Sequence, residues 1–94
     1  MDINKIKSYI GFAIKSGQIV YGIDNIEVYR KKIHLIIVSN TISDNTISKL
    51  QNIASKRNYD VIRLESNLED ITKRKNCKII AITNFELAKA IKNS

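Results

Sequence analysis

Residues 13–22 read Ala-Ile-Lys-Ser-Gly-Gln-Ile-Val-Tyr-Gly and contain two of the three glycines of the chain. Gly17 follows an amphipathic segment and Gly22 precedes another, so each stands where the backbone is expected to turn with a positive φ or a close approach. The residues between them predict a very short strand. A helix that starts after Gly22 has peptide N–H groups without intrahelical partners, and such a start suits an anion or a nucleic-acid backbone. We therefore expect the rest of the chain to be a scaffold around this corner, residues 22–25, called the Gly22 corner below.

The length and composition predict one small domain. The chain has 94 residues, of which 44% are hydrophobic, with no proline and three glycines. This composition argues against linkers and low-complexity tails. No apolar run approaches the roughly 20 residues of a membrane helix, and the first residues lack the apolar centre of a signal peptide. We expect a cytoplasmic protein without membrane contact.

Helical and strand-like patterns alternate along the whole chain. Helices are predicted over residues 2–16, 24–32 and 43–58, from Ser66 and from Thr83. Strands are predicted over residues 18–21, 33–38, 60–64 and 78–82. The second and fourth strands are almost continuously apolar, which is typical of strands buried on both faces. The alternation predicts an α/β fold, a single-domain three-layer α-β-α sandwich around a central mixed four-stranded sheet.

Polar residues mark several helix starts. Asp2 and Ser43 are expected N-caps, and Asn58 is expected to close the third helix. Ser66-Asn67-Leu68-Glu69 and Thr83-Asn84-Phe85-Glu86 have the form of capping boxes.

The charge of the chain indicates a nucleic-acid partner. Sixteen Lys and Arg stand against nine Asp and Glu, which gives a net charge of +7. Lys73, Arg74 and Lys75 are adjacent in a predicted loop before the last strand, where they can contact phosphates or simply form a solvated loop. Arg30 and Lys31 are weaker candidates, since cations at the end of a helix also suit its dipole.

The sequence offers little for catalysis or metal binding. Its one cysteine, Cys77, excludes an internal disulfide and a thiolate-cluster zinc site and is expected to be a small buried residue. Its one histidine, His34, is expected to be a strand residue that is packed or faces solvent. There is no phosphate-binding loop, dinucleotide fingerprint or nucleophile–base set. We predict a protein that is not an enzyme and has no cofactor.

Several parts of the chain match a known pattern in order and spacing. In the opening stretch these are Ala13, Lys15, Ser16, Gly17, Ile19, Val20 and Gly22. The later parts are residues 35–38 with 43–46, and residues 80–83 with Phe85 and residues 88–91. With these residues the chain resembles, over almost its whole length, the small bacterial members of the ribosomal-protein L-seven-Ae/L-thirty-e superfamily. The resemblance implies an α-β-α sandwich that binds structured RNA, typically a kink-turn.

The resemblance also places an RNA-binding site and shows where this chain departs from the family. In the family, RNA meets the turn after the first strand, the start of the second helix and the loop before the last strand. These map onto residues 22–25, continuing to Val28, and onto residues 73–77. Kink-turn binders carry Gly-x-Asn-Glu and a later Lys, but here Asp24 stands at the Asn position, Asn25 at the Glu position and Val28 at the Lys position. Ionised Asp accepts hydrogen bonds without donating, and Val28 removes one phosphate contact.

We therefore predict a ribosomal-protein-like RNA-binding protein, a monomer whose partner is ribosomal or other structured non-coding RNA, with ribosome-associated proteins as further partners. The expected RNA-binding residues are Gly22, Asp24, Asn25, Val28, Arg30, Lys31, Lys73, Arg74 and Lys75. Tyr21 can either offer its ring to an unstacked base or pack into the core.

The alternative function is a protein–protein interaction module on the same fold that has lost specific kink-turn recognition. Its interface would then include Asp24, Glu69 and Asp70. A basic surface that joins Gly22 to Lys75 favours RNA, whereas a surface divided by the acids favours a protein.

Overall fold

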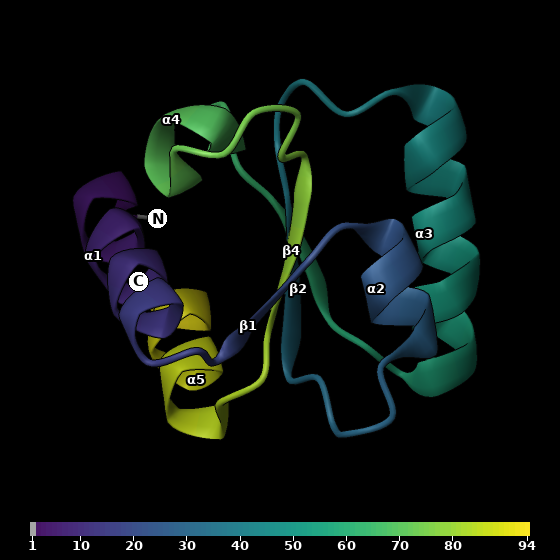
Figure 1. The fold of residues 1–94 in the computed structure, drawn as a ribbon, viewed down its shortest axis with the longest axis horizontal. Helices are drawn as coiled ribbons and strands as arrows, with labels where there is room; N and C mark the ends of the chain where they lie inside the picture. The colour runs from purple at the N-terminus through teal and green to yellow at the C-terminus, as the bar shows by residue number, and fades with distance from the viewer. Residues whose placement is uncertain (1) are drawn as a thin grey trace.

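The computed structural model describes residues 2–94, and helices alternate with strands along them (Figure 1). The helices are α1 (Ile3–Lys15), α2 (Ile23–Val28), α3 (Asp44–Arg57), α4 (Leu68–Thr72) and α5 (Phe85–Lys92). The strands are β1 (Ile19–Tyr21), β2 (Leu35–Val38), β3 (Val61–Arg63) and β4 (Ile79–Ile82). This is the predicted order of elements, and each strand is one or two residues shorter than predicted.

The sheet has the strand order β1-β4-β2-β3, so the last strand of the chain lies inside it. β4 pairs antiparallel with both β1 and β2, while β2 and β3 are parallel. This topology gathers the carboxyl ends of β1, β2 and β3 and the start of β4 at one end of the sheet, called the Gly22 end below. The start of β2, the start of β3 and the carboxyl end of β4 form the opposite end.

The sheet separates two hydrophobic cores, which confirms the predicted α-β-α sandwich. In Figure 1, α1, α4 and α5 cover one face and α2 and α3 cover the other. Along β2, Leu35 and Ile37 belong to the first core, whereas Ile36 and Val38 belong to the second. All residues of β2 and β4 are buried, as their continuous apolar sequences predicted. Burial of one such aliphatic side chain contributes about 1.5–3 kcal/mol to folding. No helix within residues 2–94 has both the length and the apolar character needed to span a bilayer.

The predicted caps of α1 and α3 are confirmed. The Asp2 carboxylate accepts from the Asn4 N–H at 3.1 Å, and the Ser43 hydroxyl accepts from the Thr46 N–H at 3.2 Å. α3 ends at Asn58, whose φ of 56° places it in the left-handed region.

The starts of α4 and α5 lie one residue later than the capping boxes predicted. Asn67 caps α4 by accepting from the Glu69 N–H at 3.0 Å, and Asn84 caps α5 by accepting from the Leu87 N–H at 2.9 Å. The predicted caps were wrong because Asn is as good an N-cap as Ser and better than Thr, and in both boxes Asn stands one position later.

The predicted extent of the second helix was also wrong, because α2 ends at Val28 instead of residue 32. Tyr29 is extended, with φ −67° and ψ 124°. The Arg57 guanidinium of α3 donates to the carbonyl oxygens of Ile26 at 3.3 Å and Glu27 at 2.7 Å, so these carbonyls have hydrogen-bond donors without a further helical turn. Arg30 and Lys31 therefore lie in the irregular connection between α2 and β2, where the helix dipole does not account for them.

A buried hydroxyl connects β2 to α4 at the Gly22 end. Ser39, directly after β2, is fully buried, and its Oγ accepts from the Leu68 N–H at 3.0 Å. The same Oγ lies 3.0 Å from Thr41 Oγ1 and donates to Asn67 Oδ1 at 3.4 Å. This contact places the start of α4, and with it the segment that leads into β4.

Replacing Ser39 with Ala should lower the free energy of unfolding by about 2 kcal/mol, because the buried Leu68 N–H loses its acceptor. Urea unfolding measures the change. The matched control is Ser48→Ala on the exposed side of α3, which should stay within about 0.5 kcal/mol of the unmodified protein. Equal stabilities of the two variants would contradict a stabilising role for Ser39.

Candidate nucleic-acid interface

The Gly22 corner has a backbone conformation that requires glycine. Gly22 has φ 82° and ψ 153°, a region in which side chains are strained. Its N–H donates to the Ile79 carbonyl at 3.0 Å, and its carbonyl accepts from the Ile26 N–H at 3.1 Å, which begins α2. A Cβ at Gly22 would project into open space. The corner therefore presents bare backbone at the surface, as the sequence predicted.

The loop between α4 and β4 carries Lys73, Arg74 and Lys75, called the basic loop below. Lys73 and Asn76 have φ values of 60° and 62°, so the left-handed conformation occurs at both ends of this turn. The Asn76 N–H donates to the Glu69 carboxylate at 3.1 Å, and the Arg74 N–H donates to Thr72 Oγ1 at 3.3 Å. These bonds give the loop a defined shape while its three cationic side chains stay exposed.

The basic loop and the Gly22 corner are neighbours, as predicted. The Arg74 guanidinium carbon lies 3.9 Å from the centroid of the Tyr21 ring, a cation–π contact. A shallow pocket of about 210 Å³ lies between the two segments. Its lining residues are Tyr21, Gly22, Asn25 and residues 74–79. A backbone turn and a cationic loop therefore form one continuous surface at the Gly22 end.

Tyr21 packs into the core, one of the two roles left open by the sequence. It is partly buried against the core under α1 and α5, and Arg74 lies over its ring. The guanidinium of Arg74, instead of the phenol ring, is thus the planar group nearest to solvent here. A guanidinium plane can stack on a base and also attracts phosphate.

The other predicted residues separate into two groups. Asn25 belongs to the pocket, where its Nδ2 donates to the Tyr21 carbonyl at 2.8 Å and closes the corner. The Asp24 carboxylate, 89% exposed, instead lies 3.8 Å from Lys49 Nζ of α3. Val28 is 71% exposed at the end of α2. Arg30 lines a different surface pocket together with Arg57, and Lys31 lies in the connection to β2.

The pocket also includes two polar residues of the loop and its end, Asn76 and Lys78, that were not in the list of expected RNA-binding residues. Asn76 lies in the turn of the basic loop, and Lys78 donates from Nζ to Thr41 Oγ1 at 3.1 Å. Lys78 was counted as the first strand residue, but β4 begins at Ile79, so its side chain joins the basic loop. The signal in the sequence was the polar run from Lys73 to Asn76, which continues at Lys78 after Cys77. Cys77 itself is buried, as expected.

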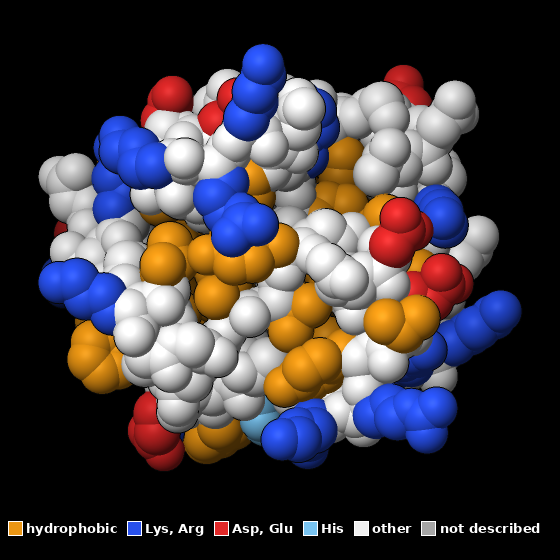
Figure 2. Space-filling model, viewed as in Figure 1, with side chains coloured by type: hydrophobic (Ala, Val, Ile, Leu, Met, Phe, Trp, Pro, Cys, Tyr) orange, Lys and Arg blue, Asp and Glu red, His pale blue; other side chains and the backbone are white. Residues whose placement is uncertain are grey.

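The charges of this surface are distributed unevenly. Figure 2 shows Lys and Arg side chains over the loop between α4 and β4, beside a hydrophobic patch, with carboxylates over α2 and α4 on either side. Within residues 2–94, the only carboxylate that is hydrogen-bonded to this loop is that of Glu69, which accepts the backbone N–H of Asn76. The lining of the pocket between Gly22 and Lys75 is therefore basic, while the exposed side of α2, which carries Asp24, is acidic and apolar.

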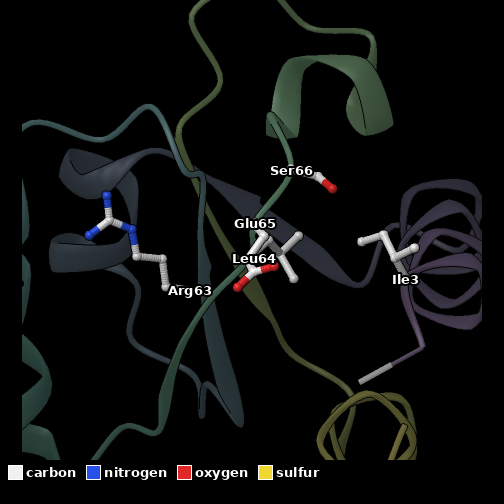
Figure 3. A pocket seen from close by; sticks show the side chains of 5 residues that line it. All are labelled: Ile3, Arg63, Leu64, Glu65 and Ser66. Carbon is white, nitrogen blue, oxygen red and sulfur yellow. The ribbon is translucent and has the colours of Figure 1, made fainter.

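A larger pocket, of about 620 Å³, lies at the far edge strand, β3. Figure 3 shows Ile3 of α1 facing the segment that leaves β3, while Arg63 points away from Ile3. The lining side chains include one guanidinium, Arg63, and one carboxylate, Glu65, so this pocket has no excess of either charge. Within residues 2–94, no group of three or more His, Cys, Asp or Glu side chains is placed to hold a metal ion.

Comparison with known proteins relates the chain to others by fold alone. No family model matches the chain, and no curated protein matches it in sequence. A solved structure of a protein with unknown function from Bacillus halodurans C is similar, with a TM-score of 0.77 and 16% sequence identity. The match covers 95% of this chain and 94% of the other. At this identity the similarity establishes a shared fold.

Replacing Gly22 with Ala should lower the free energy of unfolding by about 1–3 kcal/mol, because alanine is strained at its backbone angles. Gly11→Ala is the matched control: its Cβ would also meet nothing within 4 Å, but Gly11 lies inside α1. That substitution should raise stability by about 0.5–1 kcal/mol. Thermal or urea unfolding measures both, and changes of the same sign would contradict the backbone argument.

Proposed function

We propose that this chain is a non-enzymatic, cytoplasmic RNA-binding protein of the ribosomal-protein L-seven-Ae/L-thirty-e type. Structured RNA would bind across the Gly22 corner and the basic loop. The observation that carries the proposal is the contact between these two segments, in which Arg74 lies 3.9 Å from the centroid of the Tyr21 ring beside Gly22. Cations, a planar stacking group and bare backbone then occur together in one shallow pocket.

The cations of the basic loop suit phosphates. Lys73, Arg74 and Lys75 are exposed, and none of them forms an ion pair within residues 2–94. An RNA backbone that approaches them would release counterions, which is the main source of affinity for basic surfaces. The hydrogen bonds that fix the loop use backbone N–H groups, so these side chains remain free for RNA.

The Gly22 corner suits close approach of a nucleotide. A Cβ at Gly22 would project into open space, so its absence leaves room for a ligand against the backbone. Asn25 uses its Nδ2 for the Tyr21 carbonyl, which leaves its Oδ1 to accept from a base or a ribose hydroxyl. Cations from the loop and acceptors from the corner therefore contribute different contacts to the same RNA.

Changing Lys73, Arg74 and Lys75 together to Ala should lower RNA affinity by about tenfold or more at low salt. Each lost phosphate contact should reduce the slope of log affinity against log salt by roughly 0.7–0.9. Fluorescence anisotropy with a labelled kink-turn RNA at two salt concentrations measures both effects.

The matched control changes Lys5, Lys7 and Lys15 of α1 to Ala, since these lysines are also exposed and the same number of positive charges is lost. The control should weaken binding much less than the loop variant. Equal losses in the two variants would mean that the net charge of the protein, instead of this surface, attracts RNA.

A protein partner is the second candidate, and the exposed side of α2 favours it. Asp24 and Glu27 are exposed acids there, and Val28 exposes 71% of its surface. Carboxylates repel phosphate, whereas acids around an apolar residue suit a protein surface with cations and apolar groups. On this proposal, RNA would bind weakly and without regard to structure.

Replacing Asp24 with Asn and Val28 with Lys separates the two candidates. If the surface binds kink-turn RNA, the affinity of the double variant for it should rise by about fivefold or more. The reason is that a carboxylate that repels phosphate is removed and a cation that attracts phosphate is added. A duplex and a single strand of equal length should gain less. The control is Asp44→Asn with Ser55→Lys on α3, which makes the same charge change among exposed residues. If the affinity for all three RNAs rose equally in both variants, the rise would come from net charge alone. That outcome would favour the protein partner.

A further inference from the structure

A second cationic pocket lies at the opposite end of the sheet. It has a volume of about 430 Å³ and lies where β2 and β3 begin and where β4 leads into α5. The lining residues that matter below are Lys32, His34, Asp60, Phe85, Lys89 and Lys92. We call it the Phe85 pocket. It is separated from the Gly22 corner by the length of β4, on the order of 10 Å.

The pocket has an excess of positive charge. Lys92 Nζ lies 2.8 Å from Asp60 Oδ2, so this lysine is neutralised within the pocket. Lys32 and Lys89 are exposed and form no ion pair within residues 2–94. Two cations from different elements, the connection to β2 and the helix α5, therefore border one cavity whose acid, Asp60, is paired with a third lysine.

An exposed aromatic ring stands beside these cations. Phe85, the first residue of α5, is 57% exposed, although burial of such a ring is normally favourable. Its ring centroid lies 5.6 Å from that of His34, with the ring planes at 72°. This edge-to-face contact orients Phe85 and leaves much of its surface open. At the lower edge of Figure 2, a His side chain lies between hydrophobic and cationic side chains.

We propose that the Phe85 pocket binds an unstacked nucleotide of single-stranded RNA, with the base against Phe85 and the adjoining phosphates near Lys32 and Lys89. Aromatic rings bordered by cations are the common arrangement of single-strand sites, because every base has a face that stacks and every linkage has a charge. This site is distinct from the Gly22 corner and does not rest on the function proposed for it. Together the two sites would let one small domain hold two segments of RNA.

The test uses the whole chain and a labelled single strand of eight uridines, followed by fluorescence anisotropy. Phe85→Ala should weaken binding by about fivefold or more through loss of stacking. Its matched control is Phe12→Ala on α1, since Phe12 is 59% exposed and lies outside the pocket. The double variant Lys32→Gln and Lys89→Gln should also weaken binding. Its matched control is the double variant Lys5→Gln and Lys7→Gln on α1, which should weaken binding less. Phe85→Leu keeps an apolar side chain at the start of α5 and should lose affinity as Phe85→Ala does.

Amide NMR spectra localise the binding. In the variant with Lys73, Arg74 and Lys75 changed to Ala, the octamer should shift the amide signals of His34, Phe85 and Lys89. Two results together would overturn this proposal and leave the proposed function intact. The first is that the octamer shifts only the amide signals of residues 22–25 and 73–78 of the unmodified chain. The second is that Phe85→Ala and Phe12→Ala bind the octamer with equal affinity. Shifts at the Phe85 pocket alone would support this proposal and leave the proposed function, which concerns structured RNA, intact.

Discussion

The antiparallel pairing of β1 with β4 is the constraint on which the rest of the Gly22 end depends. Tyr21 pairs with Ile80, and the Gly22 N–H donates to the Ile79 carbonyl at 3.0 Å. These contacts join a turn near the start of the chain to a loop near its end. Without them Arg74 would have no ring to lie on, and the pocket between the two segments would not exist. One short ladder thus controls both the fold of the edge and the geometry of the proposed interface.

The two ends of the sheet illustrate how a small domain can keep charge available for a partner. At the Gly22 end, the Glu69 carboxylate accepts a backbone N–H, and Asp24 lies 3.8 Å from Lys49, so neither acid is paired with a cation of the basic loop. At the opposite end, Asp60 neutralises Lys92 but leaves Lys32 and Lys89 unpaired within the described residues. Exposed ion pairs contribute little to stability, so a cation that remains free costs the fold almost nothing. It can still attract phosphate.

The sequence predicted the fold better than the site, for a physical reason. Apolar periodicity reports burial directly, so β2 and β4 and the two-sided core could be recognised from sequence. The neighbourhood of the Gly22 corner and the basic loop was also expected from the order of elements. The early end of α2 was not predictable, because the hydrogen bonds to its last carbonyls come from Arg57, far along the chain. The contact of Arg74 with Tyr21 and the placement of Phe85 against His34 likewise depend on tertiary packing.

The position of β4 inside the sheet has a consequence for synthesis of the protein. β1 and β2 both pair with β4, which is synthesised after them, so neither of these two ladders can form before the ribosome has produced residues 79–82. Non-local pairings of this kind form late, since the chain entropy of closing long loops must be overcome first. A nascent chain that has not reached β4 can pair β2 with β3, but it would lack the other two ladders and the contact between its early turn and its late loop.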